Sequence, residues 1–300
     1  MTKEKSVLDL RDNIDGLDRQ IHDLLMQRAE LVQMIGKQKK KNGEKIILPN
    51  REASKIRTLL ERHEGHFSET ALVRIWREII SAASMLQMDM KVIIVAPSPE
   101  MNQTYHDMAR YYFGSVMPMQ MVSNPVSAIS MVKEGDASFA ILPWPEDEVE
   151  NPWWSWLHGD DPAKNLNVLV RLPYVSTEAN GLRPDHRALV VGKQSFEGSG
   201  HDHSFVMLDL DQSVSRARIL DCVKAMDMSV HSIFSRRLRG VGHERSLHMI
   251  EIDSFLDQDD SRLDDLLKKL ENQEGAYTVI GGYPVMPLMQ VHQTQKRKTA

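Results

Sequence analysis

Two cations lie on the apolar face of the first helix that the sequence predicts. Apolar residues recur at spacings of three and four from Ile14 to Ile35, and Arg28 occupies a position of this seam where the pattern calls for an apolar residue. Lys39 follows after close to three helical turns, so both cations lie on one face. A buried cation is costly unless an anion satisfies it. The pattern therefore indicates a buried ion pair, side chains that reach solvent, or an anion-binding site.

Polar residues on the apolar faces of two further predicted helices favour the binding site. Glu52 precedes Ile56 at helical spacing, and Gln87 continues an apolar stripe of the third helix. A glutamine at a buried bundle position is costly unless it is hydrogen-bonded. Together with the two cations, these side chains would suit a small dianion that also carries a hydroxyl group.

Arg11 is too distant to belong to the same patch of one chain. It lies roughly 25 Å before Arg28 along a continuous helix. It can contribute only if the helix reaches into the site of a second subunit, as an antiparallel dimer through the seam would allow. The alternative is a surface charge beside Asp15, one helical turn away.

Three helices must position these groups. The first is predicted from about Leu8 to Lys41, the second after Pro49-Asn50 and the third from about Ser68 to Met90. The first helix would be roughly 50 Å long with a single apolar seam. A helix of this kind requires a partner, so we expect residues 1–90 to form an all-α domain that dimerises.

These residues carry a resemblance to a known family. The segment 10–18 resembles the L-R-x-x-I-D-x-L-D opening of the all-helical chorismate mutases, and further matches follow in the family's order and spacing. They are Arg28-Ala29-Glu30-Leu31, Gly36-Lys37-Gln38-Lys39, Arg51-Glu52, and Ile79-Ile80 through Gln87. The resemblance covers residues 6–90 and implies an intertwined dimer of three-helix chains.

The family converts chorismate to prephenate without a cofactor or a covalent intermediate. The resemblance implies that Lys39 and Gln87 donate to the ether oxygen of the breaking bond and that Glu52 takes the hydroxyl. Donors placed where negative charge develops stabilise the transition state more than the ground state. The substrate-binding residues implied by the resemblance are Arg11 from the other subunit, Arg28, Lys39, Arg51, Glu52 and Gln87.

Two positions depart from the family pattern. Leu48 stands where many members have an acid near the hydroxyl, and Ala83 stands where some have a serine that contacts a carboxylate. The second change removes one hydrogen bond, worth about 1–3 kcal/mol when its partner stays buried. We expect slower turnover with the remaining set intact.

At Lys91 the periodicity changes to short apolar runs between helical segments, which predicts an α/β lobe over residues 91–203. The lobe weakly resembles one half of a prephenate dehydratase. The family's T-R-F motif is absent, and His186-Arg187-Ala188 is its nearest counterpart. Because the enzyme needs two lobes, we expect a degenerate, non-catalytic one.

Residues 204–290 show the order βαββαβ, which predicts a ferredoxin-like α+β domain. Its place in the chain resembles the amino-acid-binding ACT domains, and Ser235 and Arg236 stand where that family binds its effector. The alternatives are phenylalanine binding and a dimerisation module without ligand. The segment His201-Asp202-His203 is predicted to be a solvated linker, so no metal site is expected, and residues 291–300 are predicted to be a flexible tail.

Composition limits the classes of function. A net charge of −5 with pI near 6.2 argues against a nucleic-acid binder. One cysteine, no long apolar run and no leader-like start predict a cytoplasmic protein without a membrane span. The main hypothesis is a dimeric chorismate mutase. The alternatives are a bifunctional mutase–prephenate dehydratase and a non-enzymatic protein that senses phenylalanine.

Overall fold

The computed structural model describes residues 6–43, 48–147, 151–159, 161–175, 186–238, 244–272 and 274–287. Three helices come first: α1 (Val7–Asn42), α2 (Pro49–Glu61) and α3 (Glu69–Met85). Ser6 and Asp9 form a capping box that starts α1, and Gly43 ends it in the left-handed conformation. The first helix agrees with its predicted bounds to within one residue at each end, and the second begins at Pro49, close to its predicted start.

The third helix is shorter than predicted. It ends at Met85, and Gln87 lies in the turn that follows. The helix must end before Val92, because Val92 begins a strand that pairs with the strand containing Met119. The predicted end at Met90 is therefore wrong.

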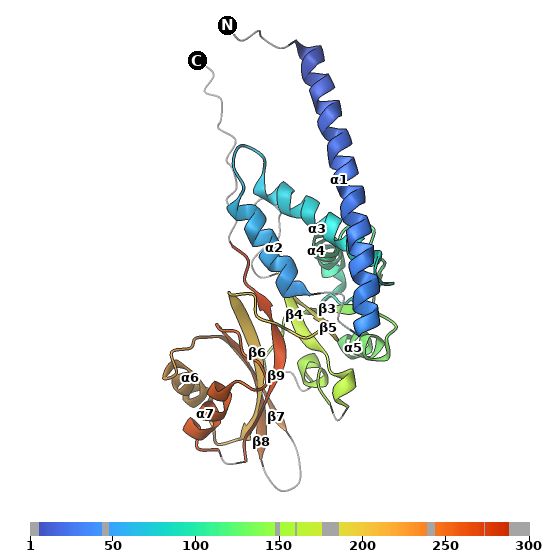
Figure 1. Ribbon diagram of the computed structural model, residues 1–300. Coiled ribbons are helices and arrows are strands. Elements are labelled where there is room, and N and C mark those ends of the chain that lie inside the picture. Colours follow the sequence, from blue (N-terminus) through green and yellow to red (C-terminus); the bar gives the residue numbers. More distant parts are fainter. Residues whose placement is uncertain are drawn as a thin grey trace, which may run out of the picture.

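The apolar seam of α1 is exposed along its length in the single chain. Every large apolar residue of the seam from Ile14 to Ile35 is more than one-third exposed. The N-terminal half of the helix extends beyond the other elements (Figure 1). A contiguous exposed apolar surface of this kind is typical of an interaction site.

The next segment is the α/β lobe. Its elements are β1 (Val92–Ile94), α4 (Asn102–Phe113), β2 (Met119–Met121), α5 (Pro125–Glu134), β3 (Phe139–Pro143), β4 (Asn167–Leu172) and β5 (Ala188–Gly192), with a short 3₁₀ helix, η2 (Trp153–Trp156), between β3 and β4. The sequence analysis missed β2, whose three residues give no apolar run. Strands β2, β1 and β3 are parallel, and β5 is antiparallel to both β3 and β4.

The C-terminal elements are β6 (Asp202–Asp211), α6 (Arg216–Lys224), β7 (Val230–Leu238), β8 (Arg245–Ile252), α7 (Ser261–Lys269) and β9 (Ala276–Pro284). Their strand order is β9-β6-β8-β7 with antiparallel neighbours, and α6 and α7 cover one face (Figure 1). This is the predicted split βαβ topology.

The predicted linker at His201-Asp202-His203 is wrong for two of its three residues. Asp202 and His203 belong to β6, and both are buried. The carboxylate of Asp202 accepts hydrogen bonds from the N–H groups of Ser199 and Gly200 at 2.7 and 3.0 Å. These hydrogen bonds stabilise the buried carboxylate of Asp202. The strand can therefore begin three residues earlier than predicted.

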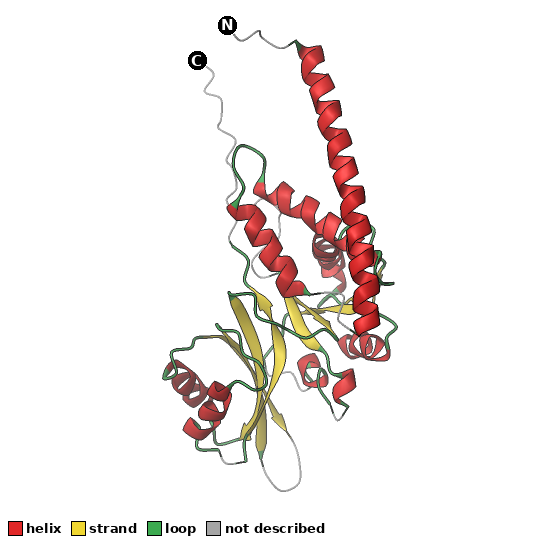
Figure 2. Cartoon of the chain, viewed as in Figure 1, coloured by secondary structure: helices red, strands yellow, loops and turns green. Residues whose placement is uncertain are grey.

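One nine-stranded sheet runs through both C-terminal regions (Figure 2). Val168 of β4 pairs with Gly281 of β9, which has φ of 96°. A Cβ at Gly281 would lie 2.2 Å from the carbonyl oxygen of Val168, so this contact requires glycine.

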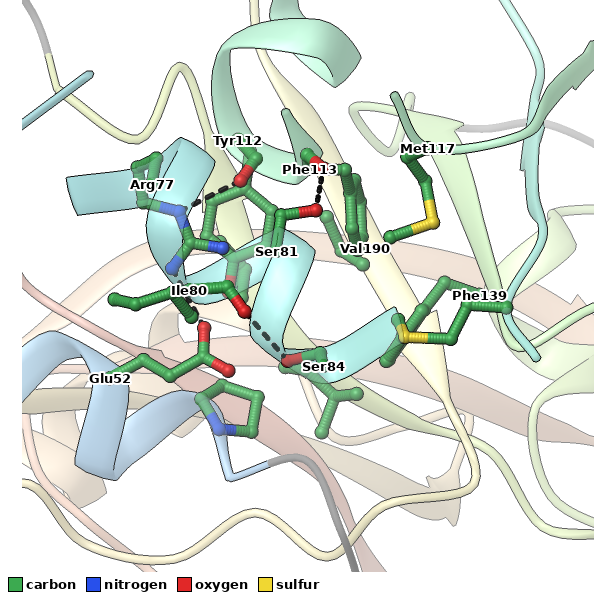
Figure 3. A pocket seen from close by; sticks show the side chains of 14 residues that line it. Glu52, Arg77, Ile80, Ser81, Ser84, Tyr112, Phe113, Met117, Phe139 and Val190 are labelled. Carbon is green, nitrogen blue, oxygen red and sulfur yellow. Dashed lines mark hydrogen bonds and ion pairs between the residues drawn. The ribbon is translucent and has the colours of Figure 1, made fainter. Parts of the chain in front are cut away.

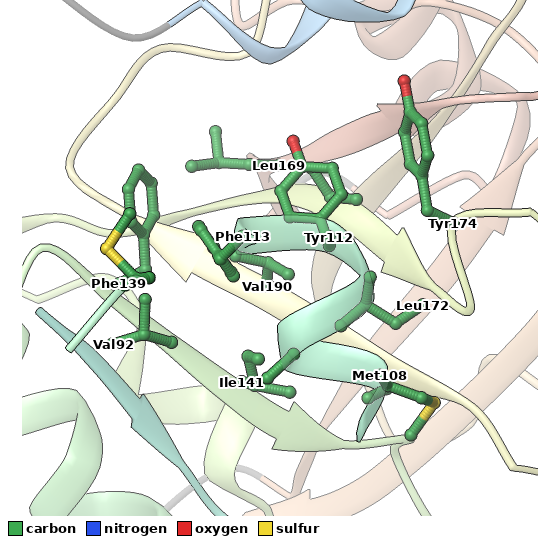
Figure 4. Packing of buried hydrophobic residues seen from close by; sticks show 14 of the residues in the cluster. Val92, Met108, Tyr112, Phe113, Phe139, Ile141, Leu169, Leu172, Tyr174 and Val190 are labelled. Atoms are coloured by element: carbon green, nitrogen blue, oxygen red, sulfur yellow. The ribbon is translucent and has the colours of Figure 1, made fainter. Parts of the chain in front are cut away.

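The core beneath α4 joins the helices to the sheet. Tyr112 and Phe113 of α4 pack on β-strand residues that include Val190 and Leu172 (Figure 4). Ile56 of α2 and residues of α3 belong to the same apolar cluster. Arg57 of α2 adds polar contacts, since its guanidinium donates to the carbonyl oxygens of Ser199 at 2.9 Å and Val285 at 2.8 Å. Within the described residues, α2 and α3 are thus part of the same packed body as the sheet.

None of the helices in the described part of the chain combines the length and apolar character needed to cross a bilayer.

Candidate active site

Gly36 of α1 is buried. A Cβ at this position would lie 2.7 Å from Cγ of Gln87, so the helix requires glycine to pass the glutamine. Lys39 follows one helical turn later and is half-buried. The structure therefore brings Gln87 next to the end of α1 that carries Lys39. The amide nitrogen of Gln87 donates to the carbonyl oxygen of Ala83 at 3.2 Å.

The three predicted arginines lie in different surroundings. Arg28 is half-buried, and burial lowers the pKa of its guanidinium. Arg51, at the start of α2, is exposed. Arg11 is exposed near the start of α1, 17 residues before Arg28.

Glu52 is held by an arginine that the sequence analysis did not select. Its Oε2 accepts a hydrogen bond from Nη1 of Arg77 at 2.7 Å, and both side chains are largely buried. Nε of Arg77 donates to the carbonyl oxygen of Tyr112 at 2.7 Å, and the guanidinium carbon lies 3.9 Å from the Tyr112 ring centroid (Figure 3). Burial alone would lower the pKa of Arg77, but Tyr112 and Glu52 outweigh it and raise that pKa.

The sequence did contain a signal for Arg77. Val73 and Ile80, four residues before it and three after it, are both buried, so Arg77 occupies the apolar face of α3. The same reasoning that selected Arg28 applies to it. Arg77 is part of a buried ion pair, which is one of the alternatives given above for a cation on the apolar face of a helix.

A small pocket lies beside this ion pair (Figure 3). Its polar lining comes from Glu52, Arg77, Ser81 and Ser84, and the hydroxyl of Ser81 donates to the carbonyl oxygen of Phe113. Its remaining lining is mostly apolar and comes from α2, α3, α4, the sheet and the loops between them. Of the six predicted site residues only Glu52 lines this pocket, so the pocket is a packing feature behind Glu52.

The helical segment matches a known family. Residues 10–88 match the family described as Chorismate mutase type II. Residues 10–88 are a chorismate mutase type II domain. The match spans α1, α2, α3 and Gln87, which are the elements that carry all six predicted site residues.

Two curated relatives carry the description bifunctional chorismate mutase/prephenate dehydratase. The protein from Aquifex aeolicus is 37% identical over 110 residues, which cover 35% of this chain and 30% of the relative. The protein from Stutzerimonas stutzeri is 27% identical over 152 residues, which cover 48% of this chain and 40% of the relative. The chain thus spans less than half the length of either relative. The second match is longer than the mutase domain, so the homology continues into the α/β lobe.

A solved structure of prephenate dehydratase from Streptococcus mutans is also similar to this chain. It shows 17% sequence identity and a TM-score of 0.45, and the match covers 66% of this chain and all of the other.

After the mutase domain, the segment 186–188 has a packing role. The guanidinium carbon of Arg187 lies 4.3 Å from the ring centroid of Trp144, and the hydroxyl of Tyr105 donates to the carbonyl oxygen of Arg187 at 2.8 Å. Burial raises the pKa of Tyr105 to about 12, so its hydroxyl stays protonated. These contacts fix the start of β5 against α4.

The predicted effector residues Ser235 and Arg236 face the loop after β3. The N–H of Ser235 donates to Asp147 at 3.1 Å, and Asp147 forms a bidentate pair with Arg216 at 2.5 and 2.6 Å. The guanidinium of Arg236 donates to Ser155 Oγ at 3.3 Å. Both residues therefore join the C-terminal domain to the α/β lobe in this chain.

Proposed function

We propose that this protein catalyses the rearrangement of chorismate to prephenate, without a cofactor, in its first 90 residues. The observation that supports the proposal is the pair of half-buried cations, Arg28 and Lys39, on the exposed apolar seam of a helix that matches the chorismate mutase family. A helix that served only for dimerisation would gain stability from leucine at position 28.

Each residue has a separate task in the proposed mechanism. Arg28 binds one carboxylate of the substrate, and the partner subunit supplies Arg11 for the second. Holding both carboxylates selects the compact conformer in which the bond can form. As the C–O bond breaks, negative charge develops on the ether oxygen, and Lys39 and Gln87 donate to it. Gln87 is neutral, so this donation does not require acid pH.

Glu52 and Arg51 complete the proposed site. Oε2 of Glu52 accepts from Arg77, which fixes the carboxylate and leaves Oε1 to accept the hydroxyl of the substrate. Arg51 lies next to it and orders the site. Arg77 is thus a positioning residue that ties Glu52 to the backbone of α4.

The proposal requires a homodimer through α1. The exposed seam of α1 supplies the apolar surface, and its projecting end carries Arg11. Pairing two such helices antiparallel would bring Arg11 of each chain toward Arg28 of the other.

Loss of chorismate, followed by its absorbance, tests the mutase. We expect Lys39→Ala and Arg28→Ala each to lower kcat/KM by about 100- to 1,000-fold, the usual loss when a donor to a developing charge is removed. Lys37→Ala is the matched control, since Lys37 is exposed on the same helix. A wild type with no rate above background, or Lys39→Ala with the wild-type rate, would show that the mutase assignment is wrong and favour the phenylalanine-sensing alternative.

A second candidate function is suggested by the relatives, whose description includes prephenate dehydratase. The packing of Arg187 against Trp144 favours a non-catalytic lobe over residues 91–203 instead. We expect the purified chain to form no phenylpyruvate from prephenate. Its formation would establish the bifunctional alternative.

For residues 204–290 we propose an ACT-like regulatory domain. The topology and the place of Ser235 and Arg236 support this assignment, with phenylalanine as the effector. Calorimetric titration of the wild type and of Ser235→Ala with phenylalanine tests it. Absence of heat in the wild type would favour a dimerisation module.

A further inference from the structure

A cluster of polar side chains that includes none of the predicted mutase residues lies at one end of the C-terminal sheet. His203 is the second residue of β6, His231 the second residue of β7, and Asp253 directly follows β8. Strand β8 lies between β6 and β7, so these three residues meet at adjacent ends of neighbouring strands.

A β-bulge turns His231 toward the other two residues. Val230 pairs with Ile252 and Ser232 pairs with Glu251, which leaves His231 as the extra residue between them. A bulge of this kind re-aims one side chain and shifts the pairing register by one residue. The rings of His203 and His231 stack with centroids 4.2 Å apart and an interplanar angle of 19°.

The three side chains direct ligand atoms at a common point. Nε2 of His203 lies 3.6 Å from Oδ1 of Asp253, and Nε2 of His231 lies 3.8 Å from Oδ2 of the same carboxylate. One ligand atom from each residue lies within 4.8 Å of the others. Two ligands on a tetrahedral zinc ion are about 3.3–3.4 Å apart, given bond lengths near 2.1 Å. Small rotations of the half-exposed His231 and Asp253 side chains would close the remaining difference.

A buried carboxylate lies behind His203 and orients its ring. Oε1 of Glu251 lies 3.1 Å from Nδ1 of His203, and its carboxylate also accepts the hydroxyl of Ser232 at 2.5 Å and that of Tyr283. This contact holds the ring so that Nε2 of His203 lies on the side of Asp253, 3.6 Å from its Oδ1. Carboxylate–histidine–metal arrangements use this second-shell contact.

We propose that His203, His231 and Asp253 bind one divalent transition-metal ion of the zinc class. Zinc and similar transition-metal ions bind readily to two imidazoles and one carboxylate, whereas Ca²⁺ and Mg²⁺ favour oxygen ligands. His231 and Asp253 are each nearly half exposed, so the ion would keep at least one coordination position open to solvent. The site would also tie the ends of β6, β7 and β8 together. It does not depend on the proposed mutase activity.

Titration with Zn²⁺ tests the site. The full chain, without a histidine tag and after treatment with EDTA, is titrated with ZnCl₂ by calorimetry, and Co²⁺ absorption reports the ligand field. We expect one ion per chain, and His231→Ala and Asp253→Asn each to weaken binding at least tenfold. Both side chains are half exposed, so these variants should fold. His201→Ala is the matched control, since His201 is an exposed neighbour in sequence outside the cluster, and it should bind as the wild type does.

Thermal melting provides a second measurement. An ion that binds only the folded state raises Tm, so Zn²⁺ should raise the Tm of the wild type and of His201→Ala, but not of His231→Ala. Absence of stoichiometric binding by the wild type would overturn the proposal. So would His231→Ala and Asp253→Asn variants that bind as the wild type does, or a His201→Ala variant that loses binding equally.

Discussion

Helix α1 and the sheet of the α/β lobe distribute their apolar residues in opposite ways. Leu17 and Leu24 of α1 are 56% and 63% exposed, whereas Val92, Ile93 and Ile94 of β1 are completely buried. Burying an exposed leucine contributes about 1.5–3 kcal/mol, so burial of the α1 seam against another surface would stabilise the protein considerably. The lobe completes its core within one chain, whereas the seam of α1 stays exposed. If the proposed dimer forms through this seam, a site that shares the seam forms together with the partner helix.

The largest expected effect comes from a charge in the seam. Ile21→Lys places a cation among the exposed apolar residues of α1, and its burial against a second copy would be costly. We expect the chain to become monomeric and to lose at least 100-fold in mutase activity, because Arg11 no longer reaches the partner's site. Analytical ultracentrifugation and chorismate loss measure the two effects.

Asp23→Lys is the control for that variant. Asp23 lies two residues further along α1, on the opposite side of the helix, and is exposed. It should leave the assembly and the rate unchanged. A dimeric and active Ile21→Lys variant would mean that the seam is not the interface.

Helices α2 and α3 pack on the lobe within one chain, and Arg77 is one of the residues that join them to it. We expect Arg77→Met to lower the free energy of unfolding by about 3–5 kcal/mol, because it leaves Glu52 buried without its partner. Urea denaturation followed by far-UV circular dichroism measures the loss. In the double variant Arg77→Met/Glu52→Gln much of the stability should return.

Arg74→Met is the matched control, since Arg74 lies on the same helix and is exposed. Its midpoint of unfolding should equal that of the wild type. Equal midpoints for Arg77→Met and Arg74→Met would contradict the assignment of Arg77 as the link between the helices and the lobe.

The sequence predicted those parts of the molecule whose periodicity is local. The seam of α1 and the order βαββαβ follow from spacing, and the structure shows them. Strand β2 could not be predicted, because it depends on pairing with β1 and not on its own residues.

Long-range pairing also explains what the sequence missed in the polar clusters. The contact between Arg77 and Glu52 joins two helices, and the contact of His203 with Glu251 joins two strands. Proximity in sequence grouped His203 with His201 instead. Only the strand register shows that His231 and Asp253 are its neighbours.

The smallest of these effects concerns a buried histidine at the junction of the lobe and the C-terminal domain. Burial lowers the pKa of His248 to about 4, with a further contribution from Arg216 that Asp147 partly opposes. In the unfolded chain the imidazole of His248 has its ordinary pKa, near 6.5. Between those two values the unfolded state binds more protons than the folded state, so stability falls as the pH falls from 6.5 toward 4.

This linkage predicts a pH-dependent difference between two variants. Lowering the pH from 7 to 5 should cost the wild type about 2 kcal/mol through His248, at roughly 1.4 kcal/mol per pH unit below 6.5. His248→Gln removes this contribution, so its stability should fall less over the same range, whereas His66→Gln, at an exposed position, should behave as the wild type does. Urea midpoints at the two pH values measure the difference. The same slope for the wild type and His248→Gln would show that His248 takes up its proton in the folded protein, and the junction would then be open to water as α1 is.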